Sequence, residues 1–378
     1  MLRRVGFIAL FFVCATACGR GSGANETTTM QVKEVPLVAT TQIEESIETP
    51  TTVVEQTVEV IPTTTTVDLS WVGPVHPLTG LPAYEGIPEA PAVVVKIGNN
   101  NQNSLPQHGL READIVYEVH IEGGKSRFMA IYHSRLPEVV MPVRSARSSD
   151  IDLLLNLNHP VFAYWGSNDI VLSELQVAER GGGFDRRSAS SQGSQYFDRD
   201  SSRARPANGK ADTGDLQGTA SNEAGTPLSI FEYGELTQNA VPAAGVQWEM
   251  AQRVVDYVWN SSLEQWIRYQ DGVPHLDENR APLTADNLLF LYVRYRISDA
   301  DPSSPQAIST GAGDGWLLRD GTVTGVTWDR QRVSDDWSLF DDESGEPVPL
   351  DVGTTWVTLA RPGEGRVLSS AEAIELIG

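Results

Sequence analysis

Cysteine is almost absent from this sequence of 378 residues. The two cysteines, Cys14 and Cys18, both lie in the N-terminal segment. The rest of the chain therefore has no thiol that could form a disulfide bond, act as a thiolate nucleophile or bind a metal ion. These three kinds of site are excluded for the folded part of the protein.

Positive charge is also scarce. Lys and Arg number 28 against 50 Asp and Glu, which gives a formal net charge of −22 at pH 7. A chain this acidic is repelled by nucleic acids and by anionic membrane surfaces. We therefore predict no nucleic-acid partner. Against this background Arg144 and Arg147 mark a place where an anion could still be held.

The common motifs for metal and phosphate binding are missing as well. No two histidines have the HExxH spacing of a zinc site. Gly311–Gly315 is glycine-rich but lacks the Gly-Lys-Ser/Thr ending of a phosphate-binding loop, so we interpret it as a turn. The sequence indicates no particular cofactor.

Residues 1–18 have the features of a secretory signal peptide. Two arginines precede an apolar run that is too short to span a bilayer, and small residues precede Cys18. The segment Ala-Thr-Ala-Cys resembles a bacterial lipobox, with Ala15 where leucine is usual. We predict that Cys18 carries acyl chains such as palmitate and anchors the protein to the extracytoplasmic face of the cell membrane. Simple secretion after cleavage at Ala17 is the alternative.

The composition then changes twice along the chain. Residues 19–70 are rich in Thr, Glu and Pro, which predicts a disordered tether. We expect an N-terminal mixed α/β domain over residues 71–235, with a long polar loop at 185–228. Short strands separated by turn residues predict a mostly antiparallel β domain over residues 246–378. The predicted fold class is therefore α+β.

A β-hairpin is expected at the core of the N-terminal domain. Residues 114–122 alternate between apolar and polar side chains, and Gly123 and Gly124 are suited to a two-residue turn. In this register one face of the hairpin is apolar. The other face would carry Glu118, His120, Glu122, Lys125 and Arg127.

An arginine- and serine-rich segment follows the hairpin. Arg144 and Arg147 precede Asp150, and the apolar spacing after Asp150 predicts a helix over residues 150–158 with Ser148 or Ser149 as its N-cap. Two guanidinium groups beside a helix N-terminus are well placed to bind an anion. We therefore expect the functional site here.

Several motifs along the chain resemble the YerB-type lipoprotein family of Gram-positive bacteria. The resemblance runs from about Pro77 to the C-terminus, with an interruption in the middle, and implies a two-domain extracytoplasmic lipoprotein without an established activity. The motifs that carry it are Pro77–Pro82, Val95–Ile97, Gly109–Glu118, Glu122–Phe128 and Pro142–Arg147.

The first interpretation of the site is a binding function. Arg144 and Arg147 would clamp an anionic envelope ligand bearing phosphate or carboxylate, Arg127 would assist, and Glu118 and Glu122 would orient the arginines or contact ligand hydroxyls.

Two other interpretations stay open. The same residues could form a transferase or hydrolase that acts on a phosphorylated or glycosidic wall substrate, with Glu118, Glu122 and Asp150 as candidate catalytic carboxylates. Asp150 could then hold a divalent cation with Asp114 or Glu118. The order of elements is similar in outline to the LytR-CpsA-Psr envelope transferases. Alternatively, the carboxylates and arginines form ion pairs only with one another. The protein would then be a structural lipoprotein that binds an envelope protein partner.

Overall fold

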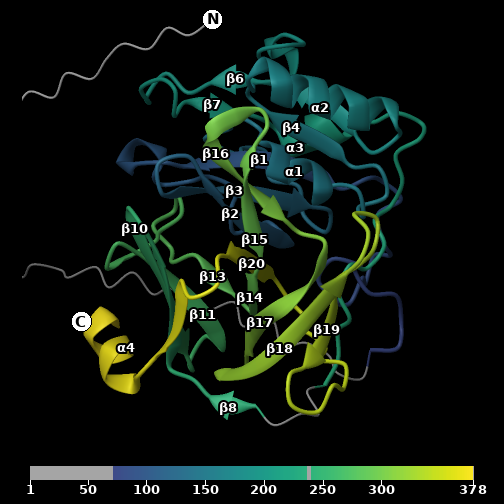
Figure 1. The fold of residues 1–378 in the computed structure, drawn as a ribbon. Coiled ribbons are helices and arrows are strands. Elements are labelled where there is room, and N and C mark those ends of the chain that lie inside the picture. The colour runs from purple at the N-terminus through teal and green to yellow at the C-terminus, as the bar shows by residue number, and fades with distance from the viewer. Residues whose placement is uncertain (1–70, 236–239, 378) are drawn as a thin grey trace, which may run out of the picture. The chain divides into compact units, whose positions relative to one another are not determined.

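The computed structural model describes residues 71–235 and 240–377 (Figure 1). The predicted signal peptide, Cys18 and the tether over residues 19–70 lie outside the described residues. Most regular structure in the described ranges is β-sheet, with a few helices, so the predicted α+β class is confirmed. No helix in these ranges is long and apolar enough to cross a membrane.

The N-terminal part of the described chain supplies five strands of the largest sheet. These strands are β1 (Val93–Asn99), β2 (Ile115–Ile121), β3 (Lys125–Tyr132), β4 (Val161–Tyr164) and β5 (Asp185–Ser188). The same part contains α1 (Ser148–Asp152), α2 (Asp169–Arg180), α3 (Thr213–Gln217), the 3-10 turns η1 (Gln102–Ser104) and η2 (Ser194–Tyr196), and the paired strands β6 (Asp198–Arg199) and β7 (Gly209–Lys210).

The C-terminal part completes the largest sheet and forms a second one. To the largest sheet it adds β8 (Val241–Pro242), β14 (Asn287–Tyr292), β17 (Gly311–Arg319), β18 (Thr322–Arg330), β19 (Ser338–Asp341) and β20 (Thr355–Ala360). The second sheet holds β9 (Gly245–Met250), β10 (Arg253–Asn260), β11 (Gln265–Gln270), β12 (Val273–Pro274), β13 (Thr284–Ala285) and β21 (Gly365–Leu368). The remaining elements are β15 (Arg294–Ser298), β16 (Asp301–Ile308) and α4 (Ser370–Ile377).

The largest sheet passes through both parts of the chain. Its order is β19-β18-β17-β14-β20-β2-β3-β1-β4-β5, with β8 paired to β18. Strand β20 lies between β2 and β14 and is parallel to both of them. Each of these three strands is buried along nearly its whole length, as expected for central strands that are covered on both faces. The C-terminal part is thus mostly antiparallel, with β20 as the exception.

Each face of this sheet has its own apolar core. One core, which includes Tyr117 and Met129, packs against α1 and α2. The other, which includes Phe128 and Trp356, packs against the second sheet. Strands β15 and β16 pair only with each other and form an arm that crosses β2 and reaches α1 (Figure 1).

The hairpin of β2 and β3 is present, but its predicted register is wrong by one residue. Glu122 belongs to the turn with Gly123 and Gly124, so Glu118 pairs with Phe128 and Val119 pairs with Arg127. Paired residues share a face, and a shift of one residue moves every side chain of a strand to the other face. Glu118 and Arg127 therefore lie on opposite faces, and the single polar face that we expected does not exist.

Other local predictions are corrected as well. The helix expected over residues 150–158 is the five-residue α1, and its N-cap is Arg147, not Ser148 or Ser149. Gly311–Gly315 begins β17 and is not a turn. The segment 185–228, expected to be a polar loop, contains β5, β6, β7 and α3.

Candidate functional site

Four cations and two carboxylates come together on the α1 side of the largest sheet. Lys96 is on β1, Arg127 on β3, and Glu122 in the hairpin turn, while the other three residues lie at or just before the start of α1. We call this group the basic cluster; its members are Lys96, Arg127, Arg144, Arg147, Glu122 and Asp150.

Asp150 acts as an internal counter-ion. The Lys96 Nζ to Asp150 Oδ1 distance is 2.6 Å, and both side chains are almost completely buried. Burial lowers the pKa of Lys96, and the adjacent Asp150 carboxylate opposes that shift. The second carboxylate oxygen of Asp150 accepts a hydrogen bond from the backbone N–H of Arg147 at 2.8 Å. The protein's own carboxylate therefore occupies the start of α1, so the expected anion cannot sit on this helix end.

Glu122 binds two of the arginines. Arg147 donates from Nε to Glu122 Oε2 at 2.9 Å and from Nη2 to Oε1, while Arg127 Nη2 lies 3.5 Å from Oε1. Partial burial would raise the pKa of Glu122, but the hydrogen bonds from Arg147 and the two positive charges lower it to about 2. Burial, together with the charges of Arg147 and Arg144, lowers the pKa of Arg127 to about 9.

Arg144 differs from the other cations of the cluster. Its side chain lies along Gly98, where an added Cβ would come within 2.6 Å of Arg144 Cγ. Its guanidinium makes no hydrogen bond or ion pair with any residue in the described part of the chain. Burial and the charge of Arg147 lower its pKa. Glu122 lies within electrostatic range and opposes this shift, but it makes no direct ion pair with Arg144. A half-buried cation without a direct ion pair is well suited to receive an anionic group.

Glu118 is not part of the basic cluster. On the opposite face of the sheet it accepts hydrogen bonds from Arg268 Nη2 on both carboxylate oxygens, each at 3.0 Å. Ser126 and Asn99 also donate to it. The expectation that Glu118 orients the arginines of the site is therefore wrong, because its charge is neutralised in a separate buried network.

The suggested metal site does not form either. The Asp114 carboxylate is buried and accepts hydrogen bonds from the backbone of His133 and Ser134, while Asp150 is engaged by Lys96. Glu118 lies on the other face. Within residues 71–235 and 240–377, no group of three or more His, Cys, Asp or Glu side chains is arranged to hold a metal ion.

The geometry suits binding better than acid–base chemistry. A general base works best with a pKa near the operating pH, whereas the pKa of Glu122 is about 2 and its oxygens face two guanidinium groups. Asp150 is held by Lys96 and by the Arg147 backbone. Of the candidate catalytic carboxylates Glu118, Glu122 and Asp150, none is therefore free to accept a proton from a substrate.

Sequence reasoning missed Lys96 and the arm. Lys96 could have been found, because a lysine within an apolar strand that is buried on both faces requires a buried counter-ion. The arm, which belongs to the C-terminal part, contacts the start of α1 beside the cluster: Ser148 Oγ is 3.1 Å from Ser298 Oγ, and the Ala307 N–H donates to Ser149 Oγ at 2.9 Å. Nothing in the local sequence pattern indicates these contacts.

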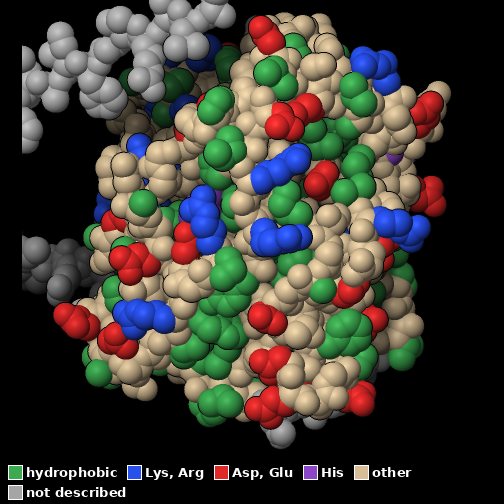
Figure 2. Space-filling view, in the orientation of Figure 1, with side chains coloured by type: hydrophobic (Ala, Val, Ile, Leu, Met, Phe, Trp, Pro, Cys, Tyr) green, Lys and Arg blue, Asp and Glu red, His purple; other side chains and the backbone are tan. Residues whose placement is uncertain are grey.

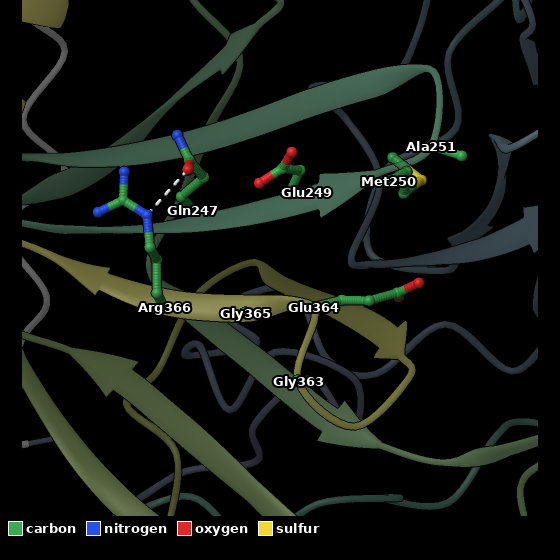
Figure 3. Close-up of a pocket in the computed structure, with 8 residues that line it drawn as sticks. All are labelled: Gln247, Glu249, Met250, Ala251, Gly363, Glu364, Gly365 and Arg366. Carbon is green, nitrogen blue, oxygen red and sulfur yellow. Dashed lines mark hydrogen bonds between the residues drawn. The ribbon is translucent and has the colours of Figure 1, made fainter.

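Two surface hollows are present in the described part of the chain, and neither is lined by Arg144 or Arg147. One, of about 340 Å³, lies between the ends of β9 and β21 (Figure 3). Arg366 and Gln247 point toward each other across it, with Arg366 Nε donating to Gln247 Oε1 at 3.0 Å. A second hollow, of about 310 Å³, lies between the hairpin turn and the arm.

Comparisons with known proteins agree with this architecture. The family model described as "Protein of unknown function (DUF3048) N-terminal domain" matches residues 78–226, and the corresponding C-terminal domain matches residues 245–357. The protein named "Putative lipoprotein YerB" of Bacillus subtilis (strain 168) is 27% identical over 314 residues, which cover 79% of this chain and 89% of the relative. A crystal structure of YerB from Bacillus subtilis has the same fold, with a TM-score of 0.68 and 23% identity over 79% of this chain and 100% of that chain. The chain therefore belongs to the DUF3048 family, with both of its domains.

Proposed function

We propose that this protein is a lipid-anchored, extracytoplasmic protein of the bacterial envelope that binds an anionic ligand, bearing phosphate or carboxylate, at the basic cluster. The name of the Bacillus subtilis relative and the lipobox-like segment ending at Cys18 support the anchor. A tether of roughly fifty residues would give the folded part a reach of about 40 Å from the membrane.

The observation that carries the binding proposal is the unpaired guanidinium of Arg144. Four cations share the cluster with two carboxylates, so the group has an excess of positive charge. Asp301 on the arm lies within electrostatic range of Arg147 and Glu122, but it is not one of the buried partners. In a chain with a net charge of −22, this local excess of positive charge is the feature that favours an anionic ligand at the cluster.

In this proposal the residues have different roles. Arg144 contacts the ligand directly. Arg147 has 18% of its side chain exposed and can share its charge between Glu122 and the ligand. Arg127 is almost fully buried, donates to the Ser145 carbonyl at 3.0 Å, and positions the loop that carries Arg144. Glu122 keeps Arg147 in place.

The two alternatives have less support. An envelope transferase or hydrolase needs a free carboxylate, and Glu122 and Asp150 are both engaged. If these arginines and carboxylates only stabilised the fold, the ion pair between Arg147 and Glu122 would be explained. Arg144, which has no ion pair, would then have no role. A partner protein bound through the C-terminal part stays a hypothesis without a specific contact to support it.

Thermal unfolding with phosphate, pyrophosphate and sugar phosphates tests the proposal. A ligand at about 100 times its Kd stabilises the native state by roughly 2.7 kcal/mol. We expect Arg144→Gln to abolish the shift, since it removes the guanidinium without breaking an ion pair. Arg332→Gln changes the charge equally at a side chain that is 78% exposed, and should keep the shift. Equal shifts in both variants would refute the site.

The anchor requires a separate test. Cys18→Ser should move the protein from the membrane fraction to the soluble or secreted fraction, because the acylated thiol is lost. Unchanged fractionation would show that Cys18 is not the anchor.

A further inference from the structure

The outer edge of β15 has backbone groups that no other strand uses. Strand β15 pairs with β16 on one side only. In an antiparallel pair, opposite residues alternate between those that exchange hydrogen bonds and those that do not. Ala307 lies opposite Tyr295, and its N–H donates to Ser149 Oγ on α1. Ala307 and Tyr295 are therefore a pair without hydrogen bonds, and the N–H and C=O groups of Tyr295 point away from β16.

The same holds two residues further along β15. Ile297 lies opposite Pro305, which has no N–H to donate. On this outer edge the backbone groups of Tyr295 and Ile297 make no hydrogen bond with any residue in the described part of the chain. A β-bulge follows Ile297 and ends the edge.

At its other end, the edge begins where β20 stops. The Val293 N–H donates to the carbonyl of Ala360, the last residue of β20, at 2.9 Å. A turn at Pro362 and Gly363 follows, and β15 continues without a neighbour on this side (Figure 1). A free strand edge is a template for another extended segment, because the added backbone completes its hydrogen bonds.

The side chains of β15 determine which segment fits. Arg294 and Arg296 lie on one face of the strand, and both are exposed. The charge of Arg296 reaches Asp152, but neither arginine forms an ion pair within the described ranges. Tyr295 and Ile297 lie on the other face, where Ile297 is 69% exposed. Opposite side chains of neighbouring strands share a face, so a matching strand is acidic on one face and apolar on the other.

The wider surface agrees with this preference for an acidic partner. Figure 2 shows Lys and Arg side chains gathered in the middle of the face where α1 and β15 lie in Figure 1. The chain as a whole has a net charge of −22, so an acidic segment finds few such places on this protein.

A segment with this pattern is present in the sequence before residue 71. Residues 53–61 read Val-Val-Glu-Gln-Thr-Val-Glu-Val-Ile, and β-branched residues of this kind favour strands. In an extended chain successive side chains point to opposite faces. One face would carry Glu55, Thr57 and Glu59, and the other Val54, Gln56, Val58 and Val60.

We propose that residues 53–61 add to the free edge of β15 as a further strand. The glutamates then lie beside Arg294 and Arg296, and the valines cover Ile297. Residues 62–70, which link the segment to the folded part, span up to about 30 Å when extended. A short link gives the segment a high effective concentration at its own molecule, so the pairing is intramolecular.

This interaction goes beyond the proposed function, because it uses no residue of the basic cluster. Its consequence is a shorter tether. With residues 53–61 held on β15, only residues 19–52 remain as a free chain, and the reach from the membrane falls from about 40 Å to about 30 Å.

Amide hydrogen exchange of the chain from residue 19 onward tests the proposal. The Tyr295 and Ile297 amides should exchange at least about tenfold more slowly in the wild type than in Val58→Pro, because proline breaks the pairing of the added strand. Glu55→Lys/Glu59→Lys should reduce the protection as well, since like charges would then face the arginines. These substitutions lie outside the folded part and leave its packing unchanged.

Matched variants elsewhere in the tether are the controls. Thr40→Pro and Glu45→Lys/Glu48→Lys make the same chemical changes outside the segment and should keep the protection. Equal exchange of the Tyr295 and Ile297 amides in the wild type and Val58→Pro would overturn the proposal.

Dilution separates pairing within one molecule from pairing between two. Intramolecular protection should not change when the protein is diluted about a hundredfold. Protection that disappears on dilution would show that a second molecule supplies the strand, and would overturn the assignment to the same molecule.

Discussion

The loss of stability caused by substituting a charged residue of this protein depends on whether its ion pair is buried. Lys96 and Asp150 are shielded from water, as are Arg268 and Glu118 on the opposite face of the sheet. Arg332 and Asp335, in contrast, form a pair in which the arginine is 78% exposed. Removing one partner of a buried pair leaves an uncompensated charge, whereas an exposed pair is replaced by water.

Lys96→Met should therefore lower the free energy of unfolding by about 3–5 kcal/mol. Denaturant unfolding measures the change. Lys96→Met/Asp150→Asn should recover part of the loss, because no charge is then left alone. Arg332→Gln, the exposed control, should cost less than about 1 kcal/mol. A loss in Lys96→Met no larger than in the control would contradict the buried pair.

Glu122 should make stability depend on pH. Its pKa in the folded protein is about 2, below its ordinary value of 4.5. The stabilisation is present above about pH 4.5 and is lost as the pH falls toward 2, because the unfolded chain binds the proton first. The difference in unfolding free energy between the wild type and Glu122→Gln should thus be largest near pH 7 and shrink by pH 3. A constant difference over that range would contradict the ion pairs of Glu122.

At the scale of elements, the hairpin shows what sequence can and cannot predict. Alternation and the pair of glycines predicted β2, β3 and the turn between them. The register failed because the connection contains three residues, Glu122, Gly123 and Gly124, and not the two glycines alone, so β3 is shifted by one residue against β2. The arm was missed because Asp301–Pro305 contains two prolines and reads as a turn. The actual register places Arg127 and Glu118 on opposite faces of the sheet, which is why Glu118 was assigned to the wrong site.

The two glycines of the turn should respond differently to alanine. Both have positive φ, 75° for Gly123 and 63° for Gly124, so each alanine costs about 1–2 kcal/mol in backbone strain. A Cβ on Gly123 meets open space, while one on Gly124 would lie 2.8 Å from Ala251 Cβ. Gly124→Ala should therefore lose at least about 1 kcal/mol more than Gly123→Ala in denaturant unfolding. Equal losses would contradict the packing of this turn against the β9–β10 turn.

At the scale of the whole molecule, the two parts of the chain share one sheet. Strand β20 pairs with β2 on one side and β14 on the other, and the Arg268–Glu118 pair joins the same parts through the second sheet. The sequence pattern predicted the separate segments but not this pairing, because contacts between residues about 240 apart leave no local signal. The predicted boundaries, 71–235 and 246–378, therefore separate two segments of the sequence. Because these segments share one sheet, we do not expect them to unfold separately.

We predict that the folded part unfolds in one cooperative transition. Tryptophan fluorescence and far-UV circular dichroism should give the same midpoint, and the calorimetric and van't Hoff enthalpies should agree. Arg268→Met should lower that midpoint without splitting the transition, because Glu118 would lose its buried partner. Two separate transitions in the wild type would show that the parts fold independently.

Arg144 is the cation that the proposed function requires to be free for a ligand. Titration calorimetry of pyrophosphate into the wild type and Arg144→Gln, at low and at physiological salt, tests it most directly. We predict saturable binding to the wild type that weakens with salt and falls at least about tenfold in Arg144→Gln, while both proteins unfold at nearly the same temperature. Equal affinity in the two proteins, or no binding to the wild type, would contradict the assignment and favour a structural role for the arginines.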